Sequence, residues 1–259
     1  MRFENRTAVI TGGGSGIGKE TARRLAQEGA SVILVGRSLD KLETAAKEIP
    51  GAAVFAADVT NAEDVQKLAA FIEKAGGGLH VLINGAGASR HSRIMDTTEE
   101  EWDAVQDVNA KSVFLVSKAL GAIMCAEAEQ ETKQTGRAVV TIASLSAHKA
   151  GAYIPHYSAA KAGAMHFTKA LALELGPYGI RANSISPGFI DTPLIEENLK
   201  NEKFQKAIEH NTVLKRPGTA AEIANVAAFM ASDEASYMTG SDVLVDGGWM
   251  IKKKQEALL

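Results

Sequence analysis

Short runs rich in Val, Ile and Leu recur along the chain and constrain its fold more than any other feature. Each run has three to five residues, too few for a helix, and is almost continuously apolar rather than alternating. Continuous apolar character is typical of parallel strands that are covered on both faces. The runs occupy residues 8–11, 31–35, 53–56, 81–84, 138–142, 182–185 and 243–245.

Longer segments with helical spacing separate these runs. Three of them open with a capping box, in which a Thr and a Glu three residues later satisfy free backbone N–H groups. The pairs are Thr60 with Glu63, Thr98 with Glu101, and Thr219 with Glu222. Gly29 is typical of the end of the first helix. Strands that alternate with helices need crossover connections. We therefore predict a single α/β domain over residues 1–259, a doubly wound, Rossmann-type parallel sheet of about seven strands with helices on both faces.

A glycine-rich turn follows the first predicted strand. Residues 11–18 read TGGGSGIG, and a helical segment begins directly afterwards. Glycines let the backbone turn tightly and approach a pyrophosphate, and the free N–H groups at a helix start favour an anion. Gly also marks ordinary loops, but this placement between strand and helix indicates a dinucleotide site.

Tyr157 and Lys161 are four residues apart, which places the phenol and the ammonium on one face of a helix. A free tyrosine has a pKa of about 10, and a nearby positive charge would lower it. Ser144 lies thirteen residues before Tyr157, at the end of a predicted strand, where its hydroxyl could stabilise developing negative charge. Ser146 is the competing candidate. A Tyr and a Lys one turn apart also occur by chance in many helices, so the surrounding motifs must decide whether this pair is catalytic.

Together these motifs resemble the short-chain dehydrogenase/reductase (SDR) superfamily, in particular its NADP-preferring branch that is similar to 3-oxoacyl-ACP reductases. The resemblance runs in family order from the TGxxxGxG loop at Gly12 to residues 245–248. It implies four catalytic residues, with Tyr157 as general acid/base: Asn109, Ser144, Tyr157 and Lys161. The Asn109 position would hold a water that connects Lys161 to solvent. Gly85 departs from the family pattern Asn-Asn-Ala-Gly, so we expect some support for the central sheet to be missing.

The resemblance also implies a nicotinamide cofactor, held by residues spread along the chain. Asp58 would contact the adenine, although a single Asp before Thr60 is also typical of a turn or a helix cap. The predicted cofactor-binding residues are Gly12, Ser15, Gly16, Ile17, Gly18, Arg37, Ser38, Asp58, Val59, Asn84, Ala86, Gly87, Tyr157, Lys161, Pro187, Gly188, Ile190 and Thr192.

The residues after the second strand indicate NADP (NADPH) rather than NAD. Gly36 stands where an acidic residue would accept hydrogen bonds from the ribose of NAD. Arg37 beside it can offer a planar fork of donors to a 2'-phosphate, and Ser38 adds a hydroxyl. Against this, Arg37 could be a solvated strand end, Asp40 lies close by, and Ser15 is not basic.

Composition excludes several other classes. A formal net charge of −3 gives no electrostatic footprint for nucleic acid. No apolar stretch is long enough to predict a membrane span, and residues 1–7 do not resemble a signal peptide, so we expect a cytoplasmic protein. Cys125 has no partner for a disulfide, and the histidines lack the spacing of metal ligands, so no metal site is predicted.

We therefore expect an NADP-dependent oxidoreductase that interconverts a carbonyl and a secondary alcohol. The alternatives are the same chemistry with NAD, or a catalytically silent NADP-binding sensor or scaffold. The resemblance implies a homotetramer and a substrate lid at about residues 190–215. It leaves the substrate open among acyl thioesters, sugars, steroids and small ketones. Arg90 and Arg93 could contact an anionic substrate or belong to a solvated loop.

Overall fold

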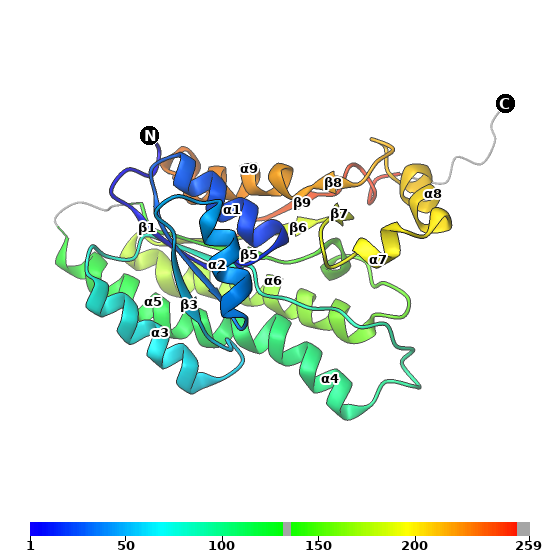
Figure 1. Ribbon diagram of the computed structural model, residues 1–259, viewed down its shortest axis with the longest axis horizontal. Coiled ribbons are helices and arrows are strands. Elements are labelled where there is room, and N and C mark those ends of the chain that lie inside the picture. The colour runs from blue at the N-terminus through cyan, green and yellow to red at the C-terminus, as the bar shows by residue number, and fades with distance from the viewer. Residues whose placement is uncertain (132–135, 253–259) are drawn as a thin grey trace.

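The computed structural model describes residues 1–131 and 136–252, which form a parallel sheet of seven strands with helices around it (Figure 1). The strands lie in the order β3-β2-β1-β4-β5-β6-β9. All seven predicted strands and the doubly wound fold are confirmed. The strand bounds are β1 Thr7–Thr11, β2 Ser31–Gly36, β3 Ala53–Ala56, β4 Val81–Asn84, β5 Ala138–Ile142, β6 Arg181–Pro187 and β9 Asp242–Val245.

Helices cover both faces of the sheet because alternate strand residues point to opposite sides. In β1, Ile10 packs into the core under one group of helices, whereas Val9 packs into the core under the other. Figure 1 shows the first group, with α1 and α9, above the sheet and the second group below it. The first group is α1 Gly16–Gln27, α2 Leu39–Lys47 and α9 Ala220–Ala231; the second is α3 Ala62–Ala75, α5 Ser112–Gln130 and α6 Pro155–Leu175.

The helix ends confirm one of the three predicted capping boxes in full and a second in part. Thr219 and Glu222 form the complete reciprocal box at α9, and Thr98 caps α4 (Glu99–Gln106) by accepting from the Glu101 N–H. At α3 the prediction is wrong, because Asn61 is the cap and accepts from the Glu63 N–H at 2.8 Å. The Thr60 hydroxyl is occupied elsewhere, since it donates to Asp58 Oδ1 at 2.7 Å.

The sheet order reverses between β1 and β4, and the loops that follow these two strands pack backbone against backbone. A Cβ on Gly85 would lie 2.7 Å from the Thr11 carbonyl oxygen, so the close approach requires glycine. Thr11 Oγ1 accepts from the N–H groups of Gly85 (3.0 Å) and Ala86 (3.2 Å). The Thr11 hydroxyl and the neighbouring backbone hold this turn, whereas the expectation that Gly85 leaves the central sheet with less support stays a prediction.

Helix α4 continues into α5 through a π-helical turn, Asp107–Lys111. The combined stretch Glu99–Gln130 is long enough to cross a membrane, and its most apolar 18-residue window has a mean hydropathy of 1.3, contrary to the sequence expectation. Half of its most apolar window is buried inside the fold, where α5 packs on the sheet. Such burial is typical of a core helix, which needs the same apolar composition.

The predicted lid region contains two short helices, α7 Glu196–Leu199 and α8 Glu202–Asn211. Its base is closed by a small parallel pair of strands that the sequence analysis missed, β7 Ile190–Asp191 and β8 Gly218–Thr219. Figure 1 shows α7 and α8 extending beyond the end of the sheet.

Candidate active site

Two adjoining cavities lie at the carboxyl ends of the strands, where ligands bind in sheets of this type. Both are lined by Gly12, Ser15 and Gly87, so together they form one groove across the switch point between β1 and β4. The predicted residues that line the first cavity are Gly12, Ser15, Gly16, Ile17, Gly18, Gly87, Ser144, Tyr157, Lys161, Pro187, Gly188, Ile190 and Thr192. The second cavity adds Arg37, Ser38, Asp58, Val59 and Ala86.

The start of α1 lies in the middle of this groove and suits an anion. Ser15 is the N-cap, but its side chain makes no capping hydrogen bond, and the first turn contains no acidic residue. The first backbone N–H groups of α1 are therefore not satisfied by a side-chain cap and can bind a phosphate. Gly12 (φ +70°) and Gly16 (φ +52°) adopt left-handed backbone conformations that favour glycine.

One end of the groove presents cations beside Asp58. Arg37, Ser38 and Asp58 line it as predicted, and so does Lys41, which the sequence analysis missed. Lys41 lies in the first turn of α2, and the packing of α2 against the glycine loop brings it to the groove. Burial raises the pKa of Asp58, but hydrogen bonds from Thr60 and the nearby Arg37 charge outweigh it and lower that pKa overall. The Thr60 bonds show that Asp58 also has the turn role that the sequence left open.

The other end of the groove collects the predicted catalytic side chains. Tyr157 and Lys161 come from the first turns of α6, and Ser144 follows β5 at the start of a short 3-10 helix, Leu145–Ala147. The Ser144 hydroxyl lies close enough to the Tyr157 phenol to lower the pKa of that phenol. Ser146 donates its backbone N–H to Ser144 Oγ at 3.1 Å, so the geometry favours Ser144 as the partner of the phenol.

Burial raises the pKa of Tyr157, and the hydrogen bond with Ser144 opposes this only in part. The Lys161 charge is not among the causes of this shift, so the expectation that Lys161 lowers the pKa of Tyr157 is wrong. The Lys161 ammonium lies 5.8 Å from the centre of the phenol ring and donates to the Ile142 carbonyl oxygen at 2.8 Å. Tyr157 is consequently a neutral phenol at neutral pH, which is the form that donates a proton.

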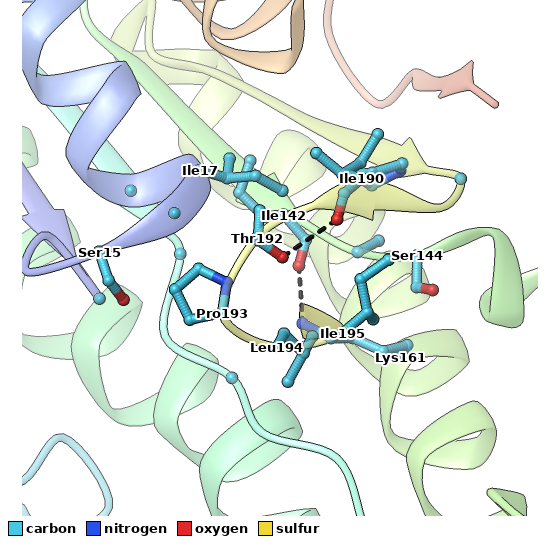
Figure 2. Close-up of a pocket in the computed structure, with 18 of the residues that line it drawn as sticks. Ser15, Ile17, Ile142, Ser144, Lys161, Ile190, Thr192, Pro193, Leu194 and Ile195 are labelled. Carbon is cyan, nitrogen blue, oxygen red and sulfur yellow. Dashed lines mark hydrogen bonds between the residues drawn. The ribbon is translucent and has the colours of Figure 1, made fainter. Parts of the chain in front are cut away.

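Lys161 is itself buried, and burial lowers its pKa to about 8. Figure 2 shows its ammonium and the Ile142 carbonyl joined beneath the segment that runs through Thr192, Pro193 and Leu194. That segment passes close to the glycine loop, since a Cβ on Gly16 would lie 3.4 Å from Thr192. The start of the predicted lid thus lies between the helix α1 start and the catalytic side chains.

Asn109 is fully buried in the π-helical turn, a type of distortion that is frequent at functional sites. Its Nδ2 donates to the carbonyl oxygens of Ala88 (2.7 Å) and Val105 (2.9 Å), whereas its Oδ1 has no hydrogen-bond partner among the described residues. A Cβ on Gly87 would lie 2.9 Å from that Oδ1 and 3.3 Å from Lys161 Nζ. Glycine therefore keeps open the space between these two polar atoms.

Asn84 is the one predicted cofactor-binding residue that lines neither cavity. Its side chain is buried, and Nδ2 donates to Ser117 Oγ on α5 at 3.0 Å. As the last residue of β4, it points under the sheet towards α5 rather than into the groove.

The sequence analysis also missed a contact that holds the segment next to Ser144 in place. His148 follows the 3-10 helix, and its Nε2 lies 2.8 Å from Asp242 Oδ2 at the start of β9. Asp242 Oδ1 also accepts from the hydroxyls of Ser184 and Ser186 on β6. The segment that carries Ser144 is thus bound to the far edge of the sheet.

Within residues 1–131 and 136–252, no group of three or more His, Cys, Asp or Glu side chains is placed to hold a metal. The residues of the groove do fit a dinucleotide. The uncapped N–H groups of α1 lie in the middle of the groove, Arg37 and Lys41 lie at one end, and the proton donor Tyr157 lies at the other end.

Comparison with known proteins agrees with this geometry. A family model described as enoyl-(acyl carrier protein) reductase matches residues 12–250. The chain is 36% identical over 255 residues to 3-oxoacyl-[acyl-carrier-protein] reductase FabG of Thermotoga maritima, covering 97% of this chain and 100% of that protein. It is 34% identical over 255 residues to glucose 1-dehydrogenase of Gluconobacter oxydans, covering 95% and 92%. The crystal structure of levodione reductase matches with a TM-score of 0.90 at 33% identity, covering 97% of this chain and 100% of that one. Because these matches extend along nearly the whole chain, it belongs to the short-chain dehydrogenase/reductase family of oxidoreductases.

Proposed function

We propose that this protein is an NADP-dependent oxidoreductase that interconverts a carbonyl and a secondary alcohol, with Tyr157 as the general acid/base. The observation that carries the proposal is the meeting of Ser144, Tyr157 and Lys161 at one end of a groove whose middle is the glycine loop. A bound NADPH would supply the hydride that the carbonyl carbon accepts.

Side chains of this protein supply the proton and stabilise the negative charge that develops during the reaction. Tyr157 donates its proton to the carbonyl oxygen, and Ser144, within hydrogen-bond reach of the phenol, donates to the same oxygen as negative charge develops. The Lys161 ammonium stabilises the phenolate that remains on Tyr157. A water between Asn109 Oδ1 and Lys161 would then return a proton from solvent, and the space beside Gly87 supports this role.

NADP is favoured over NAD by the cations at the far end of the groove. Arg37 and Lys41 line it together with the Ser38 hydroxyl, and no acidic residue stands at position 36. A 2'-phosphate there would accept charge-assisted hydrogen bonds, whereas an NAD ribose would lack its usual acidic partner. We further propose a cytoplasmic homotetramer.

Replacement of the phenol hydroxyl tests the assignment. Tyr157→Phe should lower kcat by about 10²- to 10⁴-fold, because general acid catalysis contributes about that much. NADPH binding, followed by the fluorescence of the reduced cofactor, should be retained. Tyr237→Phe serves as the control, because Tyr237 is fully exposed and lines neither cavity of the groove.

The assay is a panel of carbonyl compounds read by the absorbance of NADPH and NADH. Turnover by Tyr157→Phe within a few-fold of wild type would contradict the role of the phenol. Cofactor binding by wild type without turnover of any panel member would instead support the silent sensor or scaffold.

A further inference from the structure

A cavity of about 520 Å³ opens from Ser144 and Tyr157 towards the lid. This size is typical of sites for small molecules. The proposed function requires a substrate here, because the proton donor and its serine partner line the inner wall. The other side chains that line the cavity then indicate which class of carbonyl compound can bind.

One wall is an aromatic cluster built from three separate segments. Phe189 follows β6, Phe204 belongs to lid helix α8, and Trp249 lies in the C-terminal segment after β9. The Phe189 ring centre lies 4.7 Å from that of Trp249 and 5.4 Å from that of Phe204. Leu145, Leu194 and Ile195 extend the apolar surface.

Such a wall favours an apolar, ring-sized body and disfavours a sugar. Aromatic faces gain from contact with other rings or with hydrocarbon, beyond the area they bury. Hydroxyl groups pressed against this wall would lose their hydrogen bonds to water without finding new partners, which costs free energy.

The lining of this cavity also includes a cation. Lys149 lines the cavity, and across residues 1–131 and 136–252 its ammonium takes part in no ion pair or hydrogen bond. The acid on the same wall, Glu197, is already paired with Lys200 Nζ at 2.6 Å. His91 adds a further nitrogen donor to the same cavity.

We propose that the substrate is a ketone with an apolar ring and an anionic group, most simply a carboxylate, that pairs with Lys149. Its carbonyl oxygen lies at Tyr157 and Ser144, its ring lies against Phe189, Phe204 and Trp249, and its carboxylate reaches Lys149. The inference rests on the proposed function and adds the substrate class to it.

The test compares aryl keto acids with the methyl esters of the same acids, which lack the negative charge and carry one more methyl group. Wild type should reduce each acid with a kcat/KM at least about tenfold above that of its ester, since hydrogen bonds to charged groups are the strong ones. Lys149→Gln should bring this acid-to-ester ratio close to one, because kcat/KM for the acids falls while kcat/KM for the esters stays within twofold of wild type. Lys149→Arg should keep it.

A matched control is Lys203→Gln, which removes the same charge from lid helix α8 outside the cavity wall. It should leave the acid-to-ester ratio unchanged. A loss of the ratio in this control would mean that the overall charge of the lid, not Lys149, selects the substrate, and would overturn the inference.

Other outcomes separate this inference from the function on which it rests. Equal use of acids and esters by wild type, or higher kcat/KM for polyhydroxylated ketones or acyl thioesters, would overturn the substrate class and leave the oxidoreductase assignment standing. Failure to turn over any carbonyl compound with either cofactor would overturn both.

Discussion

Lys161 carries a charge in a buried position, and this makes its protonation the pH-sensitive part of the site. Burial lowers its pKa to about 8, while burial raises the pKa of Tyr157 above its ordinary value. Between pH 8 and 10 the phenol therefore stays protonated while the ammonium is lost. Loss of this proton removes the positive charge on Lys161 that stabilises the Tyr157 phenolate.

We expect kcat/KM for carbonyl reduction to fall as the pH rises above about 8, and pH–rate profiles at saturating cofactor measure this. Lys161→Arg should be less active but should keep its activity to higher pH, because a guanidinium does not deprotonate in this range. The same alkaline limb in Lys161→Arg would assign the titration to another group.

Cofactor preference is also decided by single residues, at the end of β2. A Cβ on Gly36 meets only Leu42, at an ordinary 3.5 Å, so an acidic side chain fits there. Gly36→Asp combined with Arg37→Ala should lower the ratio of kcat/KM for NADPH over NADH by tenfold or more. The variant loses a phosphate partner worth about 1.5–3 kcal/mol and gains an acceptor for the ribose.

The control for this pair is Lys47→Ala, which removes a cation from the last turn of α2, away from the groove. The ratio of kcat/KM for NADPH over NADH in Lys47→Ala should match that of wild type. A wild-type enzyme that prefers NADH would refute the assignment of NADP.

At the scale of elements, the glycine loop is held by close backbone packing. A Cβ on Gly18 would lie 2.8 Å from the Gly12 carbonyl carbon and 3.3 Å from Gly13 N, and backbone atoms cannot move aside as a flexible side chain can. Gly18→Ala should lower the free energy of unfolding by about 1–3 kcal/mol, the usual cost of overpacking. Thermal unfolding followed by circular dichroism measures this.

Gly14→Ala is the matched control in the same loop. Its Cβ would meet Lys41 and Leu42 at ordinary distances of 3.5 Å. The two variants should therefore differ clearly in Tm. Equal Tm values would show that the loop relaxes around an added methyl group, contrary to this account.

At the scale of the whole molecule, the outer face of α5 and α6 bears on assembly. The apolar stretch 113–124 of α5 is mostly core, since Val113, Val116, Leu120 and Met124 are buried. Phe114 of α5 lies on the outside of the fold and is 44% exposed. Its ring makes an edge contact with the ring of Phe167 on α6, and the two ring centres are 6.0 Å apart. Leu173 of α6 is 80% exposed. Exposed apolar groups on two neighbouring helices are typical of an interface between subunits.

We expect light scattering to give the mass of a tetramer for wild type, and a smaller mass for Phe114→Glu because a charge would be buried at the interface. Phe71→Glu, on α3 of the second helix layer, replaces a similarly exposed Phe at a different place and should leave the mass unchanged. A wild-type mass equal to the 27.3 kDa monomer would contradict the assembly.

The sequence by itself determined the features that depend on neighbours along the chain. The strands follow from continuous apolar runs, the glycine loop from its place between β1 and α1, and the shared face of Tyr157 and Lys161 from helical spacing. The resemblance to a family added Ser144, and its spacing of thirteen residues from Tyr157 favoured it over Ser146. These are local properties, so composition and spacing are sufficient to predict them.

Only the tertiary structure decided what depends on packing between distant segments. Lys41 reaches the cofactor groove because α2 packs beside the glycine loop, and Phe189, Phe204 and Trp249 form one wall from three separate segments. Burial, not the neighbouring ammonium, sets the pKa of Tyr157. Desolvation and contact arise from the whole fold, and no spacing along the chain records them.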